Sequence, residues 1–321
     1  MKDIFIIAEA GCNHNGNLSI AKKLAKAAKK SGADAVKFQS FNVDDLYSKF
    51  SSKKSWAKKL SLNDSETLEL KRYCDKINIE FMSTPFDIKS AIFLNKIGMK
   101  KFKIASPSIH DFSMIKVIST FKKPMIFSTG LLNFDQIKKL IKSKYYKKNS
   151  SLLYCVSKYP AETSDIFLNN ILILKKLEKN KNIGYSDHTI GLETCILASF
   201  LGAKIIEKHF KLKINQKCPD SKISIDPRTF EMMVKIIKNI RKFNLYNKKY
   251  KVVDFKKKQK NFLKGIYFKE NHKKNDLILE KNLDFKFPNL GIGAINFHKI
   301  LKKRLKKNVK KGMFLKYSDI K

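Results

Sequence analysis

A regular alternation of short apolar segments with longer amphipathic segments constrains this chain more than any other feature. Eight strands are predicted, at 4–9, 33–39, 79–84, 101–105, 124–129, 151–157, 183–186 and 203–208. Helices are predicted between them, for example at 20–29, 62–76, 88–98, 134–143, 165–178 and 192–201, with Ser19 as a capping residue. Strands separated by helices need crossover connections and form a parallel sheet.

Eight such units in about 245 residues match the count of a (β/α)8 TIM barrel. The alternative is a doubly wound open sheet, but no Gly-x-Gly-x-x-Gly turn follows the first strand. The barrel is predicted over residues 1–247, followed by a lysine-rich linker at 248–260. Residues 261–321 carry short apolar runs at 262–268, 276–279, 283–287 and 313–315 between turn formers, so we expect a small, mostly β domain. A domain of about 60 residues is marginal alone, so it should pack on the barrel or on a partner chain.

Polar side chains gather at or just past the carboxyl ends of the predicted strands. They are Glu9, Lys37, Gln39, Thr84, Lys103, Ser106, Ser128, Ser157, Tyr159, Ser186, His188 and His209. The strand carboxyl ends of a barrel lie on one face, and active sites of barrel enzymes are found there. The pattern therefore predicts one shared site.

A charged residue that closes an apolar strand is costly to bury without a partner of opposite charge. Lys37 and Lys103 are therefore predicted to bind an anion such as a phosphate group, with serine hydroxyls as further donors. Glu9 needs a metal ion, a lysine or a substrate hydroxyl. The alternatives are lysines that reach solvent and a simple salt bridge for Glu9. Cys12 and Cys155 also lie near strand ends and are predicted to be small core residues.

Two histidines follow neighbouring predicted strands, His188 and His209. Neutral imidazole is the commonest protein ligand of divalent metals, and two ligands leave coordination positions open for water and substrate. We therefore predict an open catalytic metal site, with satisfied core or surface histidines as the alternative.

Composition excludes several classes of protein. The net charge of +40 could indicate a nucleic-acid binder, but the excess of lysine runs through the whole chain and is not gathered in one segment. Nucleic acid is therefore not the expected partner. No stretch of eighteen apolar residues is present, so no membrane span is expected. Five cysteines without a Cys-x-x-Cys pair indicate reduced thiols and a cytoplasmic protein.

Eight motifs stand in a fixed order along the chain. They are IIAEAGCNHNG at 6–16, DAVKFQ at 34–39, STPF at 83–86, FKIAS at 102–106, STG at 128–130, CVSKYP at 155–160, GYSDHT at 184–189 and EKHF at 207–210. This series resembles the sialic acid synthase (N-acetylneuraminate synthase) family, which also includes legionaminate and pseudaminate synthases. The resemblance covers nearly the whole chain, because the small domain is similar to the family's antifreeze-like (SAF) domain.

The resemblance implies a transferase that condenses phosphoenolpyruvate with an N-acetylated hexosamine. The first expectation is N-acetylmannosamine, giving N-acetylneuraminate and phosphate, and the alternative is legionaminate or pseudaminate synthase. His188 and His209 would bind Mn²⁺, with Mg²⁺ or Co²⁺ as alternatives, and Glu9 would act with them in catalysis. The residues expected to hold phosphoenolpyruvate are Lys37, Gln39, Thr84, Lys103, Ser106, Ser128, Ser157 and Ser186. Glu9, Tyr159 and Asp220 would contact the sugar.

The chain departs from the family pattern at three places. Pro107 and Ser108 stand where the family has Gly and an acid, and the opening of the small domain is altered at 262–264. Phe287 replaces an arginine that, in the family, reaches the sugar of the partner subunit. The resemblance still implies a domain-swapped homodimer. A basic binding protein on a barrel scaffold is the non-enzyme alternative, and the intact polar residues listed above argue against it.

Overall fold

The computed structural model describes residues 4–178, 182–240 and 261–321. The chain divides into two compact units, Met1–Asn244 and Leu245–Lys321. The linker predicted at 248–260 lies outside the described residues.

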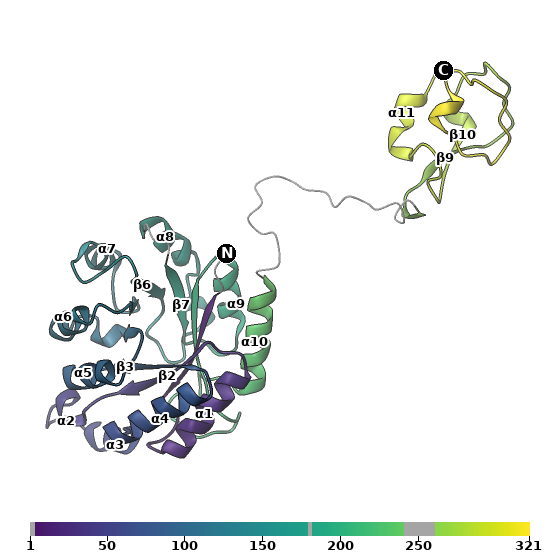
Figure 1. The fold of residues 1–321 in the computed structure, drawn as a ribbon. Helices are drawn as coiled ribbons and strands as arrows, with labels where there is room; N and C mark the ends of the chain where they lie inside the picture. The colour runs from purple at the N-terminus through teal and green to yellow at the C-terminus, as the bar shows by residue number, and fades with distance from the viewer. Residues whose placement is uncertain (1–3, 179–181, 241–260) are drawn as a thin grey trace. The chain divides into compact units, whose positions relative to one another are not determined.

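The first unit is built on one sheet of eight parallel strands (Figure 1). The strands are β1 (Phe5–Gly11), β2 (Ala35–Ser40), β3 (Glu80–Pro85), β4 (Phe102–Ile104), β5 (Met125–Ser128), β6 (Ser151–Tyr154), β7 (Ile183–Asp187) and β8 (Ile205–His209). Their order is β3-β2-β1-β8-β7-β6-β5-β4, and every hydrogen-bonded pair is parallel. The end strands β3 and β4 also lie in contact, so the sheet curls into a barrel-like (β/α)8 fold. The predicted barrel is confirmed, and the open-sheet alternative is wrong.

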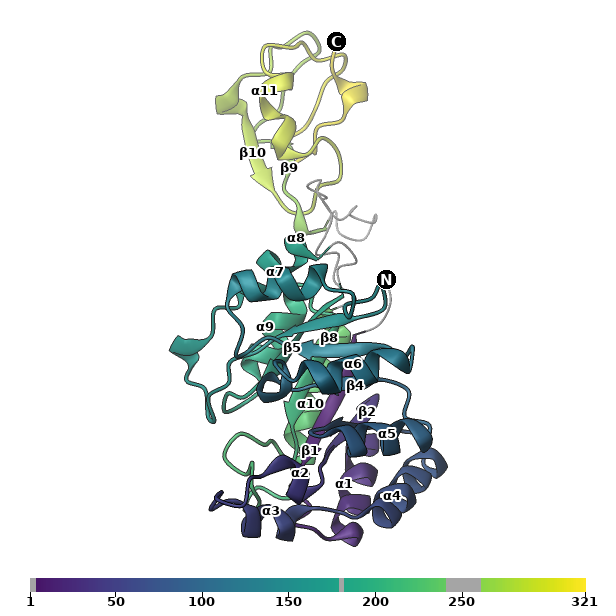
Figure 2. The same ribbon diagram turned by 90° about the vertical axis from the view of Figure 1, so that its left-hand side faces the viewer.

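Helices cover the outer face of this sheet, as Figure 2 shows from a second direction. They are α1 (Leu18–Lys30), α2 (Val43–Leu46), α3 (Lys54–Leu60), α4 (Asp64–Lys76), α5 (Ile88–Lys96), α6 (Phe112–Thr120), α7 (Phe134–Lys142), α8 (Asn169–Leu177), α9 (Glu193–Phe200) and α10 (Pro227–Ile240). Asparagine side chains cap several of them, because a short amide accepts from the free N–H groups of the first turn. Asn63 and Asn133 each form a capping box, with Glu66 and Gln136.

Two local predictions about helices are wrong. Asn17, and not Ser19, caps α1, because its side chain accepts from the backbone N–H of Ile20. The helix predicted at 165–178 begins only at Asn169. The backbone N–H of Phe167 donates to the Tyr154 hydroxyl at 2.9 Å and so takes no part in a helical hydrogen bond.

The interior of the barrel holds an apolar layer with the site above it. Ile7, Ala35, Met82, Ile126 and Leu153, from five different strands, form a buried cluster of their own. Side chains two residues apart on a strand share a face, so the next inward positions toward the carboxyl ends are polar on four of these strands. These positions are Glu9, Lys37, Thr84 and Ser128. A second and larger apolar core fills the space between the sheet and the helices.

The second unit, described from residue 261, has its own apolar core, made by residues such as Ile266, Phe268 and Leu305. Among the described residues 261–321 it has two strands, β9 (Gly265–Phe268) and β10 (Leu283–Lys286), which pair antiparallel, and one short α-helix, α11 (Phe297–Ile300), besides three 3-10 turns. A mostly β unit was predicted, but the runs at 276–279 and 313–315 form only isolated bridges. Positive φ angles at Asn275 and Gly312 end the extended backbone beside these runs. Within the described parts of the chain, no helix is both long and apolar enough to cross a membrane.

Candidate active site

Two lysines and two glutamates form a buried array at the carboxyl ends of the strands. Lys37 Nζ lies 2.5 Å from Glu9 Oε2 and 3.7 Å from Glu207 Oε2, and it donates to Thr84 Oγ1 at 2.9 Å. Lys103 Nζ lies 3.3 Å from Glu207 Oε1. All four charged side chains are at most 5% exposed. The array contains two lysines and two glutamates, so each buried side chain has a partner of opposite charge.

The two glutamates of this array differ in their ease of protonation. Burial would raise the pKa of Glu207, but Lys103 and Lys37 lower it to about 2. Burial raises the pKa of Glu9 above its usual value; Lys37 opposes this effect, and the neighbouring Glu207 adds to it. Burial would lower the pKa of Lys37, but Glu207 and Glu9 raise it. Glu9 is therefore the carboxyl of the array that takes up a proton most readily.

Serine hydroxyls from the ends of neighbouring strands lie close to Gly130. A Cβ on Gly130 would lie 2.4 Å from Ser157 Oγ and 3.0 Å from Ser106 Oγ, so both hydroxyls closely approach this backbone position. Ser106 Oγ also accepts from the Gly130 N–H at 3.0 Å and lies 3.3 Å from Cys155 Sγ. Ser128 Oγ and Ser157 Oγ are shielded from solvent and have no hydrogen-bond partner among the described residues. Buried polar atoms without a partner are rare, and here they indicate a site for a polar ligand.

The two histidines face each other across the ends of β7 and β8. The ring centroids of His188 and His209 are 5.4 Å apart, and Tyr159 stacks on His188 at 4.1 Å. His188 Nδ1 lies 2.6 Å from the Val156 carbonyl oxygen, which can only accept, so the proton belongs on Nδ1. Nε2 is then left with a free lone pair. His209 Nδ1 lies 3.4 Å from Asp220 Oδ2, at the distance of an ion pair.

The pKa values of the two imidazoles shift in opposite directions. Burial, with His209 nearby, lowers the pKa of His188 to about 4, so this ring is neutral at pH 7. Burial would lower the pKa of His209 as well, but the Asp220 carboxylate raises it. An Nδ1–H that points to a carbonyl or carboxylate oxygen is the usual arrangement of a metal-binding histidine. In the described parts of the chain, no group of three or more His, Cys, Asp or Glu forms a metal cluster. The donor set therefore fits an ion that keeps several positions for other ligands, and does not fit a closed structural site.

The remaining predicted residues converge above Gly11, whose backbone has a φ of +50°. A Cβ there would lie 3.0 Å from Asp220 Oδ2, 3.3 Å from Glu9 Oε1 and 3.4 Å from Gln39 Nε2. The absence of a side chain at Gly11 thus leaves space among three polar groups. The carboxylates of Glu9 and Asp220 both raise the pKa of His209, so they lie close to its ring. The space above Gly11 is therefore next to the histidine pair.

Sequence comparison places the chain among known proteins. Residues 24–249 match the NeuB family. The chain belongs to this family. It is 37% identical over 335 residues to the N,N′-diacetyllegionaminic acid synthase of Campylobacter jejuni. This match covers 98% of this chain and 100% of that protein. Identity to the pseudaminic acid synthase of the same species is 32% over 335 residues, covering 99% and 97%. The crystal structure of N-acetylneuraminic acid (sialic acid) synthetase from Leptospira borgpetersenii, in complex with citrate, matches with a TM-score of 0.74 at 33% identity, covering 79% and 88%.

The structure of this NeuB-family protein brings all the predicted site residues to one end of the barrel. Two further residues were not assigned a role from the sequence. Glu207 lies between both lysines and accepts from Ser186 Oγ at 2.8 Å. Its place in the site could have been predicted from the sequence, because it stands two residues before His209 on one strand and such residues face the same way. Asn13 accepts from the Asp220 N–H at 3.0 Å and so fixes the loop that carries this carboxylate; nothing in the sequence indicates that contact.

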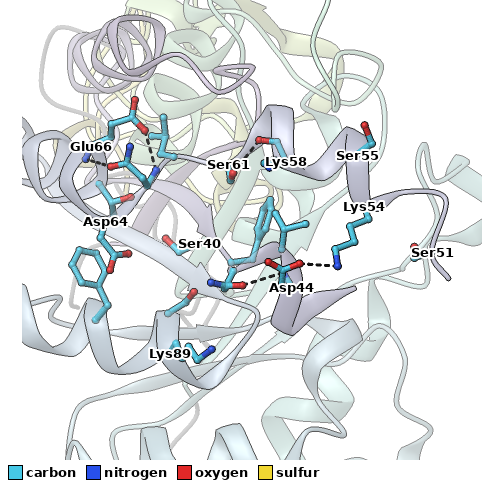
Figure 3. Close-up of a pocket in the computed structure, with 18 of the residues that line it drawn as sticks. Ser40, Asp44, Ser51, Lys54, Ser55, Lys58, Ser61, Asp64, Glu66 and Lys89 are labelled. Atoms are coloured by element: carbon cyan, nitrogen blue, oxygen red, sulfur yellow. Dashed lines mark hydrogen bonds and ion pairs between the residues drawn. The ribbon is translucent and has the colours of Figure 1, made fainter. Parts of the chain in front are cut away.

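A separate cavity of about 990 Å³ lies beside the ends of β2 and α4 and is lined by serines and lysines (Figure 3). It includes Ser40, which follows Gln39 on β2 and therefore faces away from the barrel interior. Two of its charged groups, Lys54 and Asp44, form an ion pair at 2.7 Å. This cavity of the NeuB-family barrel does not contain the residues of the active-site cluster.

Proposed function

We propose that this chain condenses phosphoenolpyruvate with the open-chain aldehyde of an N-acetylated hexosamine and releases phosphate. The product would be a nine-carbon 2-keto sugar acid. The observation that carries the proposal is the combination of two buried lysines with two hydroxyls, Ser128 and Ser157, that have no partner. Fixed cations and free hydroxyls suit a phosphate and a carboxylate, and membership of the NeuB family supports this reaction class.

In this proposal the residues have separate tasks. Lys37 and Lys103 bind the anionic groups of phosphoenolpyruvate, and their positive charge stabilises the leaving phosphate. Carbon 3 of phosphoenolpyruvate forms a bond to the aldehyde carbon, water adds at carbon 2, and phosphate leaves from carbon 2, which becomes the keto carbon. Of the two protons of the water, one leaves with the phosphate and the other replaces the proton taken up by the aldehyde oxygen. The aldehyde oxygen takes up one proton, and Glu9 is the group placed to supply it because its pKa is raised.

The histidine pair supports a divalent cofactor, Mn²⁺ with Mg²⁺ or Co²⁺ as alternatives. When bound by His188 and His209, such an ion would supply Lewis-acid polarisation of the sugar aldehyde. Glu9, Asp220 and Tyr159 would orient the sugar through hydrogen bonds and ring contact, since they surround the space next to the two imidazoles. Gln39, at the edge of this space, would hold phosphoenolpyruvate.

N-acetylmannosamine, giving N-acetylneuraminate, is the sugar first expected from the sequence. A hexose with two acetamido groups is the second candidate. It is favoured by the identity to the N,N′-diacetyllegionaminic acid synthase, which extends over the whole length of both chains. A pseudaminate-type sugar is a third member of the same series.

The test is to incubate the purified chain with phosphoenolpyruvate, MnCl₂ and each sugar separately, and to identify the keto acid by mass. At a phosphoenolpyruvate concentration below saturation, Lys103→Met should lose turnover. Lys101→Met is the matched control, because Lys101 lies two residues earlier in the chain and pairs with Glu80 at 2.6 Å, outside the array. No keto acid from any of these sugars, or equal loss in both variants, would refute the proposal.

The proposal includes a homodimer in which the small unit, as an antifreeze-like (SAF) domain, caps the barrel of a partner chain. Exposed apolar side chains on the small unit support an interface there: Phe262 is 80% exposed, Phe287 58% and Ile295 92%. Mixing inactive His209→Ala chains with chains truncated near residue 250 should restore some activity under subunit exchange. Mixed dimers without activity would show that each small unit serves its own barrel.

All five cysteines are free thiols, which supports a reducing, cytoplasmic location.

A further inference from the structure

A second buried ion pair lies directly behind the histidines. Asp187 on β7 and Lys208 on β8 are partners in the strand register, and Lys208 Nζ lies 2.7 Å from Asp187 Oδ2. Both side chains are 0% exposed. Each of these residues immediately precedes a histidine, His188 or His209. The pair therefore links the two backbone segments that carry the imidazoles.

Side-chain alternation along the strands keeps this pair out of the pocket. Ser186 and Glu207, one residue earlier, hydrogen-bond to each other within the active-site array. Asp187 and Lys208 must then point to the opposite face, toward the outer helices. The contact of Asp187 Oδ2 with Cys195 Sγ of α9, at 3.4 Å, agrees with this direction. The pair consequently does not bind substrate or metal itself.

The other contacts of the pair end on the residue that follows His188. Asp187 Oδ1 accepts from the backbone N–H of Thr189 at 3.0 Å, and Lys208 Nζ donates to the Thr189 carbonyl oxygen at 2.6 Å. Thr189 Oγ1 and the Tyr185 hydroxyl also donate to Asp187 Oδ1, each at 2.9 Å. The backbone that follows His188 is thus held by two charged groups, one of which belongs to the strand of His209.

A purely structural role accounts poorly for this arrangement. A buried ion pair is costly to desolvate and can often be replaced by apolar side chains without loss of stability. What apolar side chains would not replace is the pair of charge-assisted hydrogen bonds to the two ends of Thr189. Groups behind a ligating histidine commonly determine metal affinity through ring orientation.

We propose that Asp187 and Lys208 are positioning residues that set the separation and orientation of His188 and His209, and thereby the affinity for a divalent ion. This inference rests on the proposed metal site but not on the proposed reaction. It is therefore tested by Mn²⁺ binding to the metal-free full chain, measured from the EPR signal of free Mn²⁺.

The decisive variant is the double substitution Asp187→Asn/Lys208→Met, which removes both charges together. We expect it to unfold in urea near the wild-type midpoint and to bind Mn²⁺ about 10- to 100-fold more weakly. The affinity for inorganic phosphate, measured without metal by calorimetry, should be unchanged, because the array of Lys37 and Lys103 faces the other way. The matched control is Glu80→Gln/Lys101→Met, which removes another ion pair of the first unit and should leave Mn²⁺ affinity unchanged.

A milder variant covers the case in which the double variant does not fold. Tyr185→Phe removes only the hydroxyl that donates to Asp187, and we expect Mn²⁺ binding a few-fold weaker with the fold intact. Wild-type Mn²⁺ affinity in a folded double variant, or in Tyr185→Phe if the double variant does not fold, would overturn the inference. Weaker Mn²⁺ binding in a chain that makes no keto acid would support the inference while refuting the proposed reaction.

Discussion

Replacement of Glu207 by glutamine should destabilise the barrel and yet strengthen anion binding. Glutamine keeps the shape of the side chain but removes the charge that lies 3.3 Å from Lys103 Nζ and 3.7 Å from Lys37 Nζ. The folded protein lowers the pKa of Glu207 from 4.5 to about 2. Since one pKa unit corresponds to about 1.4 kcal/mol, the charged form of Glu207 contributes about 3 kcal/mol to the free energy of unfolding.

The pH dependence of this loss follows from the direction of the pKa change. A carboxyl with a lowered pKa stabilises the fold above its unfolded value of 4.5, and this contribution disappears as the pH falls toward about 2. Wild type should therefore exceed Glu207→Gln by about 3 kcal/mol at pH 7, and the difference should shrink between pH 4.5 and 2. Urea unfolding followed by the fluorescence of Trp56 measures this, because it is the single tryptophan and lies in α3 of the first unit.

The same variant should bind inorganic phosphate roughly tenfold more tightly, because a nearby like charge in a buried site opposes an anion by one to a few kcal/mol. Calorimetry measures that affinity. Glu80→Gln is the control, since Glu80 pairs with Lys101 at 2.6 Å and does not touch the array. A stability difference that stays constant with pH, or unchanged phosphate affinity in Glu207→Gln, would refute this account of the array.

Three further results are expected. Exhaustive chelation should abolish turnover and Mn²⁺ should restore it, while His209→Ala should lower turnover at least ~100-fold; full activity after chelation would contradict the metal site. Lys103→Ala should raise the phosphoenolpyruvate concentration needed for half-saturation, and a changed dependence on sugar alone would show that the pocket is wrongly assigned. Gly130→Ala should weaken phosphate binding measured by calorimetry, because its Cβ would lie 2.4 Å from Ser157 Oγ; unchanged binding would show that this hydroxyl is not needed.

The barrel and the face that carries the site could be predicted from the sequence because both follow from local periodicity. A parallel strand buried on both faces is apolar up to its carboxyl end, so a polar residue there, such as Lys37 or His188, stands out. The same alternation would have identified Glu207 from its spacing to His209. Of these two residues, only His209 was given a role from the sequence.

Contacts that depend on strand register or on long loops could not be predicted. Asp187 and Lys208 become partners only through the stagger of β7 against β8, which no local pattern specifies. Asp220 reaches His209 through a loop that Asn13, near the other end of the chain, holds in place. In the small unit, apolar runs predicted strands at 276–279 and 313–315, but these segments form only isolated bridges with distant parts of the unit, which no local pattern specifies.

The most direct test of the central claim is a ³¹P NMR time course of the purified chain with phosphoenolpyruvate and Mn²⁺, with and without an N-acetylated hexosamine. The proposed reaction predicts that the phosphoenolpyruvate resonance is replaced by that of inorganic phosphate only when the sugar is present, with one keto acid formed per phosphate. Phosphate release without sugar, or phosphoenolpyruvate that persists with N-acetylmannosamine and with the diacetamido hexoses alike, would contradict it.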